Sequence, residues 1–412
     1  TQTADLFWTY WPLLPLALGV ELIARAVLAD RATKSGKTVV PFHVESGVTV
    51  VTVIVVVIGL VGAMLGPVSW SGFKLSGIRI GSINLSHASR NAVQDLTIGK
   101  EVKAVTIKNP VGKVRVKAGA AADQITVDAT VTGNGTTQEE ANRNAEATKV
   151  TTTVTGTLAE VTVTLPEDFA GLGINKFNLA SVDLTVGLPE GLDVAVKNQF
   201  GEVEVATGRA VDIDNEFGKV TVHGFAGDAV VDNQFGEVTV EEGAGSVTVV
   251  NANGAVNISD VKGDVSARSS FGAVEVNDVG GKVEARTSNG SVHIRRPGKD
   301  VTARTSFGAI EIVDSRAEVT AETSNGAINL STSYPVVGAY DLRTRFGAVN
   351  VSFPDSSKVA IHAETSFGNI NTNLSGKISK EESRQSFDSA LNGGGVQVTI
   401  KTSNGGVDLT AH

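Results

Sequence analysis

The chain has 412 residues, including 45 Gly, 10 Pro and no Cys, and 41% of its residues are hydrophobic although only 5% are aromatic. This length exceeds one ordinary domain, and the apolar content excludes a disordered chain. Abundant Gly, Val and Thr indicate short β-strands and tight turns, which excludes an all-α protein. The absence of Cys excludes disulfides, Cys-ligated zinc and thiol nucleophiles. A net charge of −9 does not suit nucleic-acid binding, so we expect no nucleic-acid partner.

Two apolar stretches near the start predict transmembrane helices, one over roughly residues 6–29 and one over residues 47–66. The loop between them is basic, so the positive-inside rule places it in the cytoplasm. Its basic residues are Arg31, Lys34 and Lys37. We therefore expect residues 1–72 to form a helical hairpin in the cell membrane, with everything after it on the extracytoplasmic side. Because the sequence begins at Thr1 on the outer side, we also expect a further segment before it.

Two ionisable residues, Glu21 and Arg25, lie within the first apolar stretch. They are four positions apart, so they share a helix face and can pair. Ionisable groups in lipid also mark transport pathways. Two spans without further charged residues do not make such a pathway, so we interpret Glu21 and Arg25 as a local intramembrane pair.

From residue 194 onward the sequence repeats a Phe-Gly or Asn-Gly dipeptide followed by alternating apolar residues. Most successive anchors are 17 or 18 residues apart, and the spacing widens to 21 and then 37 near the end. A short fixed period predicts a solenoid. We expect a parallel β-solenoid of about 11 coils with an 18-residue period and two strands per coil. The anchors are Phe200, Phe217, Phe235, Asn253, Phe271, Asn289, Phe307, Asn325, Phe346, Phe367 and Asn404.

Stacked coils turn each position of the repeat into a column along the rod. One inward column is Asn in the early coils and Thr in most later ones. These side chains must bond to one another or to the turn backbone, because a buried unpaired polar group costs about 1–3 kcal/mol. The Phe anchors have the parity of the inward Val and Ala residues, so we expect them to pack in the core rather than form an aromatic binding strip.

An outward column brings Arg268, Arg286 and Arg304 together as a basic stripe, a candidate site for an anionic cell-wall polymer. The alternative interpretation, which we favour, is a solvated face of mixed charge.

The remaining segments do not follow this repeat. Residues 73–103 are expected to be a linker, and residues 104–193 a β-rich adaptor with one helical stretch at 137–148. Residues 374–395 are polar and Gly-rich, so we interpret them as an insertion that forms a surface loop in the solenoid of residues 194–412.

The units TSNGSVHI and TSFGAIEI, preceded by IKNPVGKVRV, VTLP and GLPEGLDV, resemble bacterial adhesin-like domains of unknown function that form β-solenoids. This resemblance covers roughly residues 100–412. The segment FWTYWPLLPLALGVEL resembles the transmembrane region of LiaF-type cell-wall-stress proteins of Gram-positive bacteria. The resemblance implies a surface-exposed, membrane-anchored protein and brings no catalytic residues.

Motifs of catalytic and cofactor chemistry are missing from the sequence. The six His residues form no HExxH pair, and neither a phosphate-binding Gly-rich loop nor a GxSxG elbow is present. We therefore expect no metal and no cofactor. An alternative is a glycan-active enzyme that uses Asp212, Asp214 and Asp232. Retaining hydrolysis needs two carboxylates about 5 Å apart, a separation that adjacent coils would provide. We favour solvated acids at these positions.

These observations predict a non-enzymatic, membrane-anchored scaffold or adhesin-like interaction module. We expect it to self-associate, because the last repeat runs to His412 and would leave an uncovered solenoid end. The alternatives are a sensor or accessory subunit of a cell-envelope stress system, which would partner another membrane protein, and, less favoured, a glycan-active enzyme.

Overall fold

The computed structural model describes residues 86–119, 121–166 and 180–412. The predicted membrane hairpin, with the Glu21–Arg25 pair, lies outside these residues. No helix within them is long and apolar enough to cross a membrane. Residues 86–97, part of the predicted linker, form a strand.

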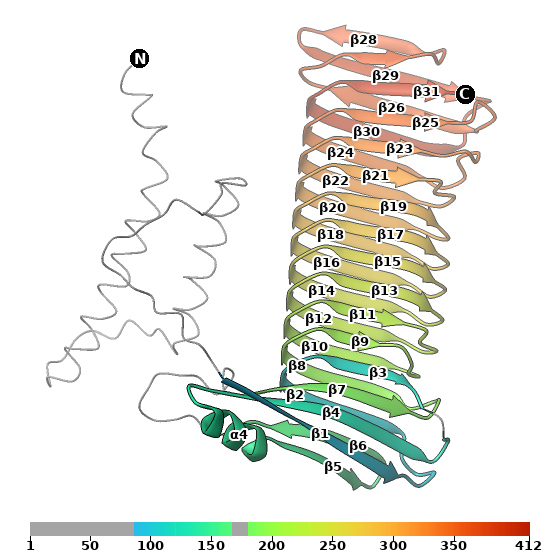
Figure 1. Ribbon diagram of the computed structural model, residues 1–412. Helices are drawn as coiled ribbons and strands as arrows, with labels where there is room; N and C mark the ends of the chain where they lie inside the picture. The colour runs from blue at the N-terminus through green and yellow to red at the C-terminus, as the bar shows by residue number, and fades with distance from the viewer. Residues whose placement is uncertain (1–85, 120, 167–179) are drawn as a thin grey trace, which may run out of the picture. The chain divides into compact units, whose positions relative to one another are not determined.

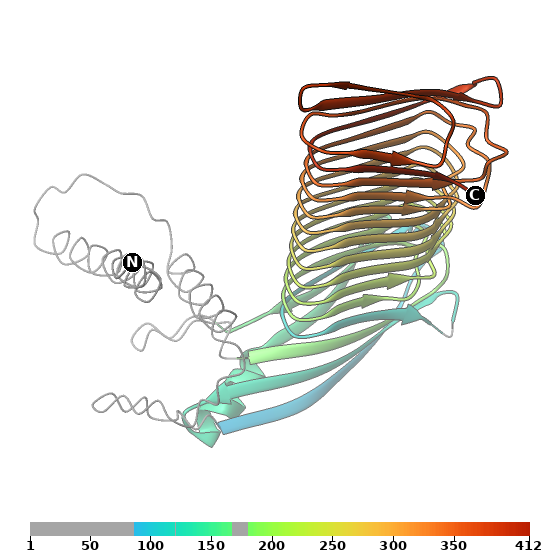
Figure 2. The ribbon, with the colours of Figure 1, turned by 90° about the horizontal axis from the view of Figure 1, so that it is seen from above.

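The described chain is all-β apart from one helix and stacks into a solenoid with two long, mostly parallel sheets (Figures 1 and 2). Sheet A contains, in spatial order, β1 (Ser86–Thr97), β4 (Gln124–Gly135), β7 (Ala180–Leu188), β3 (Val114–Ala118), β9 (Val203–Val205), β11 (Val220–His223), β13 (Val238–Gly243), β15 (Val256–Val261), β17 (Val274–Val279), β19 (Val292–Pro297), β21 (Ile310–Val313), β23 (Ile328–Ser331), β25 (Val349–Phe353), β31 (Val407–Ala411) and β27 (Ile370–Thr372).

Sheet B faces sheet A across the core. It contains, in spatial order from the other end, β28 (Lys377–Glu381), β29 (Arg384–Leu391), β26 (Val359–Thr365), β30 (Val396–Asn404), β24 (Tyr340–Phe346), β22 (Val319–Asn325), β20 (Val301–Phe307), β18 (Val283–Asn289), β16 (Val265–Phe271), β14 (Val247–Asn253), β12 (Ala229–Phe235), β10 (Val211–Phe217), β8 (Asp193–Phe200), β2 (Ala104–Val111), β6 (Leu158–Thr164) and β5 (Lys149–Thr155).

Each coil forms because the apolar residues alternate along both of its strands. In β16 and β18, Val265 pairs with Val283 and Ala267 with Ala285, and all four side chains are buried. Facing side chains from sheet A, such as Val274, complete the core. Burial of one aliphatic side chain contributes about 1.5–3 kcal/mol, so successive coils hold one another in register.

Glycine follows the anchor because the corner between the sheets is tight. Gly308 has φ +151° and donates its N–H to the carbonyl of Asn325 at 3.0 Å. A Cβ at Gly308 would collide with the carbonyl oxygen of Gly290 in the neighbouring coil. The repeated glycine therefore supplies both the backbone angle and the close approach between coils.

The solenoid begins earlier than residue 194. Strand β2 pairs in register with β8, so that Asn109 lies opposite Asn198 and Val111 opposite Phe200. Residues 104–118 thus form a coil of the rod, with Val-Gly as its corner where later coils have Phe-Gly. A search for Phe-Gly and Asn-Gly anchors misses this coil.

Antiparallel strands close the first end of the rod. Strands β6 and β7 extend the stack beyond β2 and β3, and β5 then adds antiparallel to β6 while β4 and β1 add antiparallel on the side of β7. The helix α4 (Gln138–Ala147) follows the N-cap Thr137, whose hydroxyl accepts the N–H of Glu140 at 3.2 Å. This helix agrees with the predicted stretch at 137–148.

At the other end of the rod, the spatial order of the strands differs from their order in the chain. Two of the expectations from the sequence are wrong there. Strand β30 enters between β24 and β26, so the last coil of the sequence is not the outermost coil. Beyond β26, residues 377–391 form the antiparallel strands β29 and β28 (Figure 1). The expected surface loop is therefore a hairpin that covers the end, and the expected uncovered coil at His412 is absent from this end.

Candidate functional site

The outer face of sheet B carries the predicted basic stripe. Arg268, Arg286 and Arg304 lie in register on β16, β18 and β20. Each is close to a carboxylate: Glu284 lies 3.1 Å from Arg268 and 2.9 Å from Arg286, and Glu322 lies 3.3 Å from Arg304. The column therefore presents paired charges rather than three unpaired cations.

The three aspartates considered for glycan cleavage lie on the same sheet, nearer its other end. Asp214 pairs in register with Asp232 on one side and with Lys197 on the other. All three aspartates, including Asp212, are exposed on the outer face. Among the described residues, no group of three His, Asp or Glu side chains is placed to hold a metal ion.

The inward polar column is held by two kinds of hydrogen bond. In the early coils the amides bond to one another: Asn198 donates to Asn215 at 2.9 Å, and Asn215 donates to Asn233 at 2.7 Å. In later coils the hydroxyl donates to a corner glycine, as Thr287 does to the Gly272 carbonyl at 3.0 Å. Both kinds give the column hydrogen-bond partners, as the sequence required, although among the described residues the buried Oδ1 atoms of Asn109 and Asn198 have none.

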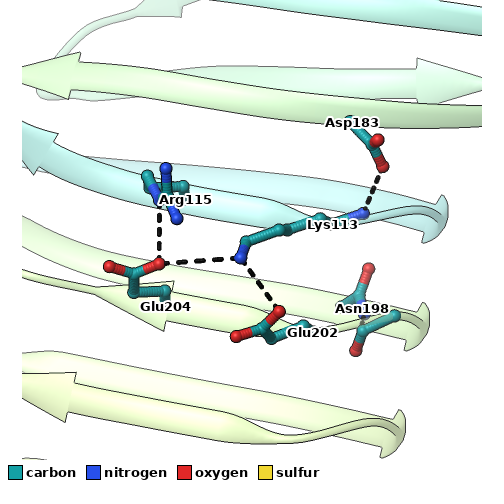
Figure 3. Close-up of polar contacts among 7 residues, drawn as sticks. Lys113, Arg115, Asp183, Asn198, Glu202 and Glu204 are labelled. Carbon is teal, nitrogen blue, oxygen red and sulfur yellow. Dashed lines mark hydrogen bonds and ion pairs between the residues drawn. The ribbon is translucent and has the colours of Figure 1, made fainter.

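The first coils are joined by ion pairs on the outer face of sheet A (Figure 3). Lys113 lies 2.9 Å from Glu202 and 3.8 Å from Glu204, and Arg115 lies 2.8 Å from Glu204. Asp183, from the strand on the other side, accepts the backbone N–H of Lys113 at 2.8 Å. These contacts link β7, β3 and β9, which are neighbours in the sheet but not in the sequence.

A second charged column lies near the ends of the sheet A strands β17 and β19. Asp278 and Arg296, one coil apart, both have positive φ, and the guanidinium of Arg296 donates to Asp278 at 2.6 and 2.5 Å. These hydrogen bonds and the positive charge lower the pKa of Asp278. The pair is exposed, so its contribution to stability is small.

The corner anchors form two different aromatic arrangements. Phe200, Phe217 and Phe235 are partly buried and stack in successive coils, with ring centroids 5.0 Å apart. Farther along the rod, four phenylalanines are exposed: Phe271 by 57%, Phe307 by 58%, Phe346 by 51% and Phe367 by 66%.

The expectation that all these rings pack in the core is therefore wrong for the four exposed ones. Strand alternation ends at the buried residue two positions earlier, for example Thr305. The chain turns at the anchor itself, so strand parity no longer determines which way Phe307 points. Alternation along the strands therefore does not reveal this exposed aromatic column.

Comparisons with known proteins match this architecture to one family. The family model of Toastrack DUF4097 matches residues 102–307 and again residues 299–410. A candidate cell adhesion protein of Clostridium sporogenes is similar at 11% identity and a TM-score of 0.20, covering 79% of this chain and 100% of its own. A candidate adhesin of Bacteroides fragilis is similar at 10% identity and a TM-score of 0.20, covering 78% and 97%.

Neither structural likeness is close enough to carry an argument about function, and a search of curated proteins found no match. The family matches, in contrast, together span most of the chain and both halves of the solenoid. This chain belongs to the Toastrack DUF4097 family.

Proposed function

We propose that this protein is a membrane-anchored, non-enzymatic surface module whose solenoid lies outside the cytoplasm and binds extended partners of the cell envelope. The observation that carries the proposal is the columnar surface of sheet B. Outward positions recur in register from β8 to β26, so the rod presents a long row of evenly spaced side chains. Small molecules are usually bound in an enclosing pocket, whereas a column suits a long partner.

The order of the strands gives the rod two different ends. Strand β1 is the edge of sheet A at the first end of the rod, and β28 is the edge of sheet B at the other. The predicted membrane spans precede β1 in the sequence. The chain would therefore pass from these spans into β1, at the first end of the rod.

Cysteine labelling in intact cells tests this topology, because the natural chain contains no Cys. Lys299→Cys places one thiol on an exposed position of the solenoid. Ser35→Cys places one in the basic loop between the predicted spans. We expect a membrane-impermeant maleimide to label Lys299→Cys in intact cells and to label Ser35→Cys only after permeabilisation.

The cysteine-free natural chain is the background control. Labelling of Lys299→Cys only after permeabilisation would overturn the extracytoplasmic placement. Recovery of the full chain in the soluble fraction after cell breakage would overturn the membrane anchor.

A further inference from the structure

The exposed phenylalanines alternate with asparagine when the coils are taken in spatial order. Phe271 pairs with Asn289, Asn289 with Phe307, Phe307 with Asn325, and Asn325 with Phe346. In the sequence the next anchor is Phe367, which would break the alternation. In the structure Asn404 pairs with Phe346, and Phe367 comes next, since its N–H donates to the Ser403 carbonyl at 2.8 Å. The displaced last coil thus restores the alternation.

The strand register gives the positions of these rings a regular spacing. Rings of successive coils are 5.0 Å apart in the stacked part of the same column, so rings two coils apart are separated by about 10 Å. We call this surface the Phe/Asn stripe. Its members are Phe271, Asn289, Phe307, Asn325, Phe346, Asn404 and Phe367.

Small residues precede and follow most anchors of the stripe, so the rings project beyond the neighbouring side chains. The residue after each anchor is Gly. The residue before it is Ser in six of the seven coils and Arg345 in the remaining one. The side-chain amides of Asn289, Asn325 and Asn404 are exposed and make no hydrogen bond to any other residue that the structure describes. Between the rings the stripe therefore offers free amides and hydroxyls.

We propose that the Phe/Asn stripe binds an uncharged, extended β-1,4-linked glycan chain. In such a chain every second sugar presents the same face, at a repeat close to the ring spacing. The rings would stack on the apolar faces of alternate sugars, one ring to a sugar. The Asn amides and Ser hydroxyls would bond to hydroxyl and acetamido groups of the sugars between the rings. This inference rests on the proposed function, since it names the extended partner.

Charge and area favour this occupant over two others. The stripe is neutral apart from Arg345, and the neighbouring Arg268, Arg286 and Arg304 have carboxylates beside them, so an anionic polymer meets few unpaired cations. A second copy of the chain would match the period. However, four half-exposed rings, each with roughly 150–250 Å² in full, fall short of the ~800 Å² per partner that a stable dimer buries.

Binding of chitooligosaccharides of two to eight sugars to the full chain in detergent tests the proposal. Four rings at this spacing contact sugars one, three, five and seven of a bound oligomer. Affinity should therefore rise mainly when the third, fifth and seventh sugars are added, by about threefold to tenfold for each ring contacted. Longer oligomers should bind with the same affinity as the heptasaccharide. Maltooligosaccharides, whose α-1,4 linkage curves the chain, serve as the control and should bind weakly at every length.

Variants of the stripe distinguish specific recognition of the glycan from nonspecific binding to exposed aromatic surface. Phe307→Asn inserts a residue that the column already holds in adjacent coils, so the fold should persist, and it should weaken heptasaccharide binding by about threefold to tenfold. Asn289→Phe adds aromatic surface but closes one gap, and it should also weaken binding. Val337→Asn removes an apolar side chain that is 65% exposed outside the stripe and should leave binding unchanged.

Several outcomes would overturn the proposal. These are tighter binding by Asn289→Phe, equal affinity for maltooligosaccharides, binding of purified teichoic acid but not chitooligosaccharides, or an oligomer of the chain that dissociates in Phe307→Asn. Such results leave the labelling test of the topology unaffected. Failure of the glycan inference is therefore distinguishable from failure of the proposed function.

Discussion

Phe346 pairs with Asn404 across the parallel strands β24 and β30, although residues 347–403 separate them in the sequence. The end of the chain therefore lies between two earlier coils, and its two strands β30 and β31 support the coil of β26 and β27. A similar inversion exists at the first end, where β2 lies between β6 and β8. Both ends of this repeat protein depend on contacts between segments that are distant in sequence.

Truncation after residue 395 should therefore do more than remove one coil. In a sequential solenoid, loss of the last repeat leaves the others stacked, because each repeat contacts only its neighbours. Here the loss of β30 and β31 removes the surface on which β26 and β27 pack. We expect amide hydrogen exchange to show lost protection throughout 359–391 and retained protection in β10–β22. Retained protection in β26 would contradict this account.

Deletion of the β28–β29 hairpin should make the protein associate. Phe387 of β29 is buried, and its strand pairs with β26 along seven residues. Replacement of residues 376–394 by a short Gly-Ser linker exposes the β26 edge, and unpaired edges pair with other chains. Mass measurement in detergent should then show oligomers or aggregates at concentrations where the natural chain is smaller.

A milder variant keeps the hairpin in place. Lys377 and Lys380 are the exposed lysines of the edge strand β28, and lysine on an edge opposes pairing. The double variant Lys377→Thr/Lys380→Thr should also raise the mass, although less than the deletion does. An unchanged mass in both variants would show that the hairpin does not protect this end.

Asn215 lies in the middle of the amide ladder and both accepts from Asn198 and donates to Asn233. Asn215→Ala breaks both bonds and leaves buried groups without partners, so the free energy of unfolding should fall by about 1–3 kcal/mol. Asn215→Thr should lose less, because its hydroxyl can bond the preceding corner carbonyl, as Thr287 does. Urea denaturation measures both, with the exposed Gln234→Ala as the control. Equal stability of Asn215→Ala and Gln234→Ala would disprove the role of the ladder.

Gly308 should tolerate no side chain. Gly308→Ala meets both an unfavourable φ and the carbonyl of Gly290, so it should lower the free energy of unfolding by more than about 3 kcal/mol. At Gly406 an added Cβ meets only the Asn369 carbonyl at 3.4 Å, an ordinary contact. Gly406→Ala should therefore lower the free energy of unfolding only slightly, and thermal unfolding of the two variants measures the difference. Similar losses in both variants would mean that the tight corner is not the cause.

Periodicity predicted the parts of the fold that repeat. Alternation in segments such as Val283–Asn289 was sufficient for the parallel coils, and the buried polar column followed from the same pattern. The ends could not be predicted in this way. Which strand lies beside β24 depends on competition between β26 and β30, whose inward residues are both aliphatic at matching positions.

The surface of the site was predictable only in part. The register of Arg268, Arg286 and Arg304 follows from the repeat, whereas their pairing with Glu284 and Glu322 depends on side-chain conformations. The exposure of Phe307 depends on the turn at the corner, where alternation no longer applies. The position of Asn404 between Phe346 and Phe367 depends on the order of the last coils.

Tyr340 should make stability depend on pH at the alkaline end. The residue is 1% exposed, its hydroxyl donates to the Ser315 carbonyl at 3.4 Å, and burial raises its pKa to about 12 from 10.0. Because the folded pKa is the higher one, the unfolded chain loses this proton first as pH rises. The contribution of Tyr340 to the free energy of unfolding is therefore complete below pH 10 and declines between pH 10 and about pH 12. A shift of this size corresponds to about 2 to 3 kcal/mol.

Urea denaturation at a series of pH values from 9 to 12, on the full chain and on Tyr340→Phe, measures this contribution. The variant cannot ionise at this position, so its stability should fall less steeply over that range, while lysines that titrate there affect both proteins alike. Absorbance of tyrosinate gives a second readout, since the ionisation of Tyr340 in the natural chain should be delayed until the protein unfolds. If the free energy of unfolding fell equally with pH in the two proteins, burial in the core would not oppose the ionisation of Tyr340.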